Sequence, residues 1–159
     1  MSDKDTVDVL IETPKGSTIN YEYDEKSGAI KEKMRFSGGF SFIYNYGFIP
    51  KTKSEDGDCL DCFVLGSDPI EVKSLIKVRP IGMIDLIDKG EQDNKIIAVL
   101  ANDSFFEEVD SLEDLLESPK EEFMKFFKEI AIQKKKKMKV RGFYGKGRAL
   151  EEIKNHRVE

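Results

Sequence analysis

The chain has 159 residues, 31 of them acidic and 26 basic, giving a formal net charge of −5. This length suits one domain with a single core, so we expect one domain over residues 1–159. The acidic balance argues against a nucleic-acid partner, and no apolar run is long enough to cross a membrane. The N-terminal residues lack the basic and apolar regions of a secretory signal, which predicts a cytoplasmic location.

Three strands are predicted first, over residues 7–12, 19–24 and 29–36, and the last two form a hairpin. An aromatic stretch follows over residues 40–50, with five aromatic residues in nine positions. Such a stretch could stack nucleic-acid bases, but it contains few lysines or arginines. We therefore predict a long connection that packs into the core.

The next segment holds the densest group of acids, Glu55-Asp56-Gly57-Asp58-Cys59-Leu60-Asp61, just ahead of a buried strand. Carboxylates this close repel one another unless cations lie between them. Oxygen ligands without histidine favour Mg²⁺, Mn²⁺ or Ca²⁺, and the glycine allows the bend that convergence requires. A polar turn ahead of a strand is the alternative, and the spacing does not fit an EF-hand.

Cysteine and histidine offer no separate site. Cys59 and Cys62 form a C-x-x-C motif, but zinc would need two more ligands, and we expect small, half-buried residues with pKa values raised by Asp58 and Asp61. The only histidine, His156, lies near the C-terminus, where a solvated role is expected.

Further strands are predicted over residues 76–79 and 81–87, with a bend between them, and over 96–100. The acid-rich loop at 88–95 is typical of a solvated turn when considered alone. Helices are predicted after residue 111, from the Ser118-Pro119 start, and over 148–154, with a strand at 139–145. The lysines at 134–137 are interpreted as a solvated helix end, with a phosphate-facing role as the minority interpretation. Together these elements predict a mainly β, α+β fold: a small closed sheet with helices outside.

Several segments, considered together, resemble the family I soluble inorganic pyrophosphatases. The family's Asp-x-Asp-x-x-Asp signature is matched by Asp56-Gly57-Asp58-Cys59-Leu60-Asp61. The agreement spans nearly the whole chain in order and includes Ile11-Glu12-x-Pro14, Tyr21-Glu22-Tyr23-Asp24, Ser27-Gly28-Ala29, Asn45-Tyr46-Gly47-Phe48-Ile49-Pro50, Arg79-Pro80-Ile81-Gly82, Asp88 to Asp93, and Lys95.

The resemblance implies an OB-like five-stranded closed barrel flanked by C-terminal helices, and hydrolysis of pyrophosphate with Mg²⁺, or Mn²⁺ as an alternative. It also implies a homo-oligomer, commonly a hexamer in bacterial members. The metal ligands implied are Asp56, Asp61, Asp88, Asp93 and Glu22, with Glu12 as a further active-site residue. Asp58 matches the carboxylate that takes a proton from water, and the substrate-binding groups implied are Arg35, Tyr46, Lys128 and Lys95.

Three positions depart from the family pattern, all on the phosphate-binding side. Asn20 stands where a lysine is usual, Phe42 (or Tyr44, with a shifted gap) is aligned with a tyrosine, and Phe127 replaces the tyrosine of a Tyr-Lys pair. Lys15, Lys33 or a residue of the 134–137 run could compensate. The alternative hypothesis is therefore a protein that binds metal and phosphate with little turnover, or that prefers another phosphoanhydride. A nucleic-acid binder that uses the aromatic stretch ranks third.

Overall fold

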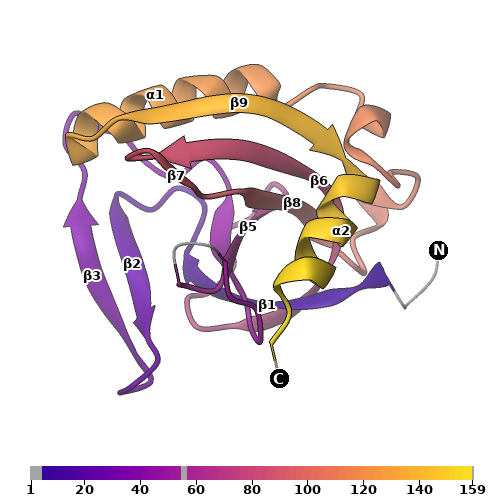
Figure 1. The fold of residues 1–159 in the computed structure, drawn as a ribbon, viewed down its shortest axis with the longest axis horizontal. Helices are drawn as coiled ribbons and strands as arrows, with labels where there is room; N and C mark the ends of the chain where they lie inside the picture. Colours follow the sequence, from indigo (N-terminus) through magenta and orange to yellow (C-terminus); the bar gives the residue numbers. More distant parts are fainter. Residues whose placement is uncertain (1–4, 55–56, 159) are drawn as a thin grey trace.

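The computed structural model describes residues 5–54 and 57–158. Five strands close into a barrel: β1 (Val7–Thr13), β4 (Asn45–Ile49), β5 (Leu60–Leu65), β8 (Lys95–Leu100) and β6 (Leu75–Asp88). The ring runs in that order and closes because β1 also pairs with β6 (Figure 1). The β5–β8 pair is parallel and the other pairs are antiparallel. The predicted OB-like closed barrel is confirmed.

Two helices flank this barrel, as predicted. Strand β6 also carries β7 (Glu91–Gln92) and β9 (Met138–Gly145) along its second half. Helix α1 (Lys120–Lys134) lies along β9, and α2 (Lys146–His156) packs beside β6 (Figure 1). Two short 3₁₀ helices, η2 (Ser104–Phe106) and η3 (Leu112–Asp114), lie between β8 and α1. No helix in the described residues is long and apolar enough to cross a membrane.

The strands bury apolar side chains on both faces, which explains why β5 is almost continuously apolar. Phe63 and Leu65 belong to the cluster that packs against α1, whereas Leu60, Cys62 and Val64 belong to the cluster that packs against α2. This alternation follows the two-residue period of a strand. The barrel wall is therefore covered by apolar packing on both of its faces.

A separate hairpin of β2 (Ile19–Asp24) and β3 (Ala29–Arg35) stands beside the barrel (Figure 1). Its pairing is confirmed, with a register irregularity between Asn20 and Tyr21. Its strands are only partly buried, so the hairpin provides a wall for a cavity rather than a core layer.

The aromatic stretch packs into the core as predicted, but its second half is strand β4 and not a connection. Phe40 and Phe42 pack on Phe126 of α1, with ring centroids 5.4 and 5.1 Å apart. A Cβ at Gly47 would lie 2.0 Å from the Leu10 carbonyl oxygen of β1, so only glycine permits this strand pairing. The missing side chain at Gly47 is what allows the strand to form.

Two further expectations are corrected. The two strands predicted on either side of residue 80 are one strand, β6, because the bend there is an irregularity in register between Pro80 and Gly82. Helix α1 begins at Lys120, with Pro119 at its cap position. Ser118 still accepts a hydrogen bond from the Lys120 amide, at 3.3 Å.

Candidate active site

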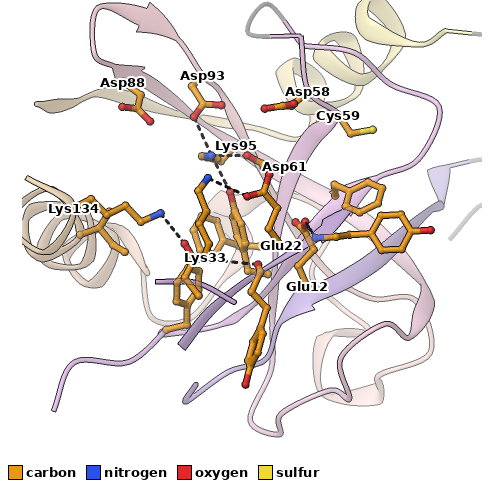
Figure 2. A pocket seen from close by; sticks show the side chains of 18 of the residues that line it. Glu12, Glu22, Lys33, Asp58, Cys59, Asp61, Asp88, Asp93, Lys95 and Lys134 are labelled. Atoms are coloured by element: carbon orange, nitrogen blue, oxygen red, sulfur yellow. Dashed lines mark hydrogen bonds and ion pairs between the residues drawn. The ribbon is translucent and has the colours of Figure 1, made fainter. Parts of the chain in front are cut away.

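A cavity of about 880 Å³ lies between the β2–β3 hairpin, the barrel wall and the end of α1. Its lining is dominated by carboxylates and lysines over an aromatic floor that includes Phe42, Phe63 and Phe127. Figure 2 shows these charged side chains pointing toward one another from separate elements. A mixed lining of this kind suits a small ligand that carries several negative charges together with cations.

Lys95 is the centre of the cavity's charge network. Its Nζ lies 2.6 Å from Asp61 Oδ2 and 3.0 Å from Asp93 Oδ2, and it donates to the Tyr46 hydroxyl at 2.8 Å. The parallel β5–β8 register places Lys95 opposite Asp61, which explains the closest pair. Burial opposes the charge on Lys95, but the two carboxylates outweigh it and hold the lysine pKa well above its usual value. Burial, reinforced by Asp61, raises the pKa of Tyr46, so its hydroxyl stays protonated.

Two glutamates extend the acidic lining toward the hairpin. Glu12, on β1, is buried and accepts a hydrogen bond from the Tyr23 amide at 2.9 Å. Burial, together with the nearby charges of Asp61 and Glu22, raises the pKa of Glu12 to about 7. Glu22, on β2, lies 3.4 Å from the Lys33 ammonium.

Asp88 closes the opposite side at the end of β6. Its Oδ2 accepts from Lys136 at 2.7 Å, whereas its Oδ1 is buried and has no hydrogen-bond partner among the described residues. A buried carboxylate oxygen without a partner is unfavourable, and a bound cation would satisfy it.

The donor chemistry fits a hard metal ion. All the candidate ligands are oxygens, and a carboxylate offers about four acceptor positions, so Lys95 does not exhaust Asp61 or Asp93. Within the described residues, however, no three acidic, cysteine or histidine side chains converge closely enough to enclose an ion by themselves. The predicted ligand Asp56 lies outside the described residues, so its contribution to such a set is not described.

The structure gathers most of the predicted residues but leaves out two. Those that line the cavity are Glu12, Glu22, Tyr46, Asp58, Asp61, Asp88, Asp93 and Lys95. Arg35 is exposed and pairs with Glu32 at 2.6 Å, and Lys128 is exposed on α1; neither belongs to the lining. The cationic lining comes instead from lysines that include Lys33, Lys134 and Lys136.

The interpretation of the 134–137 run as a solvated helix end is wrong for two of its lysines. Lys134 Nζ donates to Asn20 Oδ1 at 2.7 Å, and Lys136 pairs with Asp88. For Lys134 the signal is helical spacing, because it follows buried Ile130 by four residues on the same face, whereas Lys136 lies beyond the helix end.

The departures from the family pattern lie inside this site. Asn20, Phe42 and Phe127 all line the cavity, whereas Tyr44 donates to Glu122 at 2.8 Å and is not part of the lining. Cys59 stands at the wall, where burial and a hydrogen bond to Glu25 raise its thiol pKa to about 11. A raised thiol pKa was expected from Asp58 and Asp61, but burial is its main cause and Asp61 makes only a minor contribution.

A closed five-stranded barrel with a carboxylate- and lysine-lined cavity at its side is suited to binding metal ions together with phosphate-like anions. Comparison with known proteins specifies the class further. The family model described as inorganic pyrophosphatase matches residues 9–158. An inorganic pyrophosphatase from Saccharolobus solfataricus is 39% identical over 153 residues, which cover 94% of this chain and 89% of the relative.

Solved structures agree. The Thermus thermophilus inorganic pyrophosphatase has a TM-score of 0.87 at 37% identity, covering 94% of this chain and 88% of that one. The Helicobacter pylori enzyme has a TM-score of 0.90 at 31% identity, covering 96% and 91%. The chain belongs to the inorganic pyrophosphatase family.

Proposed function

We propose that the chain hydrolyses inorganic pyrophosphate to two orthophosphates in this cavity. The observation that carries the proposal is a family match over residues 9–158 on a chain whose cavity combines acidic metal-type ligands with lysines. The nucleic-acid alternative has no support, because Phe40 and Phe42 pack on α1 and not at an open surface.

Metal dependence is general in this family, and we propose Mg²⁺, with Mn²⁺ as the alternative. Asp61, Asp88 and Asp93 would hold it with Asp56 and Glu22. The ion would supply neutralisation of pyrophosphate charge and activation of water. The orphaned Asp88 oxygen and the all-oxygen ligand set support this assignment.

The chain's own residues then carry the remaining work. Asp58 accepts a proton from the attacking water, whose oxygen bonds to one phosphorus while the bridging P–O bond breaks and its electrons leave with the second phosphate. Tyr46, whose hydroxyl oxygen accepts from Lys95 at 2.8 Å, keeps its own proton to orient a phosphate oxygen, and Lys95 supplies a fixed positive charge beside it. Cationic groups in the cavity stabilise the charge that shifts to the leaving phosphate. Substrate roles for Arg35 and Lys128 stay predictions from the sequence, because neither faces this cavity.

The test is phosphate release from pyrophosphate, with and without Mg²⁺, by the native chain and by Asp58→Asn and Asp68→Asn variants. Asp68 is an exposed aspartate outside the cavity lining and serves as the matched control. We expect Mg²⁺-dependent release that falls by about a hundredfold or more in D58N and is retained in D68N. No release by the native chain above the metal-free blank would contradict the proposal.

The binding-only alternative rests on Asn20, which stands where the family usually has a lysine, and on Phe42 and Phe127, which present no hydroxyl to the cavity. Family membership favours the enzyme. Calorimetry that showed tight pyrophosphate binding beside negligible hydrolysis would reverse that preference.

We also propose a homo-oligomer, with a hexamer as the expectation from the family. The large apolar side chains of Phe105 and Leu116 are almost fully exposed to solvent and would be available to a subunit contact. Light scattering coupled to gel filtration would test this, and a monomer at micromolar concentration would contradict it. The expected cytoplasmic location stays a prediction from the sequence.

A further inference from the structure

We propose that Lys134 is a phosphate-binding residue of this site, brought in by the last turn of α1 and oriented by Asn20. The inference rests on the proposed function and deepens it. The Lys134 ammonium would donate a hydrogen bond to an oxygen of the pyrophosphate substrate and, after the reaction, to an oxygen of the orthophosphate product.

The placement of Lys134 follows from the apolar face of α1. Phe126, Phe127 and Ile130 are buried and line the cavity floor, and Lys134 continues the same face one turn later. The helix ends there, because Lys135 adopts a left-handed conformation with φ of 52°. The side chain of the last helical residue therefore extends into the cavity (Figure 2), while the chain continues to β9.

Lys134 differs from the other lysines of the cavity in what it contacts. In the described part of the chain, four lining lysines are paired with carboxylates: Lys31 with Asp24, Lys33 with Glu22, Lys95 with Asp61 and Asp93, and Lys136 with Asp88. Lys26 and Lys89 are exposed. Lys134 is only partly exposed, and its ammonium bonds to the neutral oxygen of an amide.

Asn20 fixes the direction of this bond. Its amide nitrogen donates to Thr13 Oγ1 at 3.3 Å and to the Tyr21 carbonyl at 3.4 Å, so its oxygen is the atom left to face Lys134. Asn20 is 5% exposed and therefore holds one geometry. An ammonium has three donors and this bond uses one, which leaves two for an anion in the cavity.

The surrounding charges favour an anion at this point. Burial, and the positive charges of Lys33, Lys136 and Lys95, lower the pKa of Lys134 to about 8, with Asp88 opposing them. These groups face it from β3, from the turn after α1, from β8 and from β6. A phosphate bound here would relieve the repulsion among the lysines, so binding and lysine protonation support each other.

The experiment measures binding of inorganic phosphate, which is not turned over, by calorimetry in the presence of Mg²⁺. The variants are Lys134→Met, Lys134→Arg and Lys125→Met, the last being an exposed lysine of the same helix. We expect K134M to weaken phosphate binding by about ten- to a hundredfold, the range of a charge-assisted hydrogen bond. K134R should recover part of that loss, and K125M should match the native chain.

A pH series separates a binding role from a structural one. Between pH 7 and pH 9.5 the native chain should lose phosphate affinity relative to K134R, because arginine keeps its charge. The inference is overturned if K134M and K125M bind phosphate within twofold of each other. It is also overturned if the ratio of the native chain's phosphate affinity to that of K134R does not change with pH. Should K134M fail to fold, K134Q replaces it in the same comparison.

The same proteins are assayed for pyrophosphate hydrolysis, so the two proposals fail separately. An inactive native chain that still loses phosphate affinity in K134M would overturn the proposed function and keep the lysine assignment. An active native chain whose K134M variant binds phosphate as tightly as the native chain would keep the proposed function and overturn the lysine assignment.

Discussion

Replacing Lys134 by methionine should remove a pH dependence of the protein's stability even as it weakens phosphate binding. The folded-state pKa of Lys134 is lowered to about 8 from 10.5, chiefly by burial. Between these values the unfolded chain holds a proton that the folded chain does not, so stability rises with pH across this window. Below about pH 8 the native chain carries the full cost of the buried charge, and K134M does not.

The size of the effect follows from the shift. The cost of the buried charge falls by about 1.4 kcal/mol for each pH unit above the folded-state pKa of about 8. At pH 9.5 it is therefore about 2 kcal/mol smaller than at pH 7, and partial exposure of the lysine reduces this difference to about 1 kcal/mol. Thermal melts of the metal-free proteins should show K134M gaining about 2–4 °C over the native chain at pH 7, relative to their difference at pH 9.5. K125M should show no such change. If K134M is instead less stable than the native chain by the same amount at both pH values, Lys134 contributes to stability through packing and hydrogen bonding, and its charge is not costly to bury.

Two other perturbations test the barrel and its charge network. Lys95→Met should destabilise the metal-free protein by about 3 kcal/mol in chemical unfolding, because it leaves the partly buried Asp61 and the buried Asp93 without their cation. Added Mg²⁺ should recover more stability in K95M than in the native chain, and equal recovery would contradict a metal site beside Lys95. Gly47→Ala should prevent folding or cost more than about 4 kcal/mol, since its Cβ would meet β1 at 2.0 Å. Gly147→Ala, in open space on α2, should be neutral or stabilise by up to about 1 kcal/mol in the same melts.

Most strands of the barrel could be predicted from the sequence because their apolar runs are bounded by polar or turn-forming residues. Strand β4 could not be predicted in this way, because Gly47 weakens the strand pattern. The reason for a glycine at this position appears only in the structure, where the Leu10 carbonyl of β1 lies against it. The continuity of β6 through Pro80 was equally hidden. Proline usually interrupts a ladder, and here the irregularity in pairing with β8 accommodates it.

The acidic cluster at 55–61 stands out in the sequence by its own density of carboxylates, whereas Asp88 and Asp93 were assigned only through the family resemblance, because their loop alone is typical of a solvated turn. The lysines of the 134–137 run were expected to be solvated. Lys134 is distant from the cluster in sequence, and a run of lysines at a helix end is normally solvated. What decides its role is the aromatic face of α1, which turns the last helical residue inward.

Asn20 and Lys134 therefore form one unit: the amide provides an acceptor at the point where the helix delivers an ammonium. Asn20→Lys in the native background would place two ammonium groups about 4 Å apart, a repulsion of up to about 4 kcal/mol at an effective dielectric constant of about 20. We expect N20K to lower both stability and phosphate affinity. The double variant N20K/K134N returns one ammonium and one amide to the same place by exchanging their elements. It should recover most of the affinity in the calorimetric titration. Failure of the double variant, with its fold intact in melts, would show that the cavity needs the charge on α1 and not merely at this point.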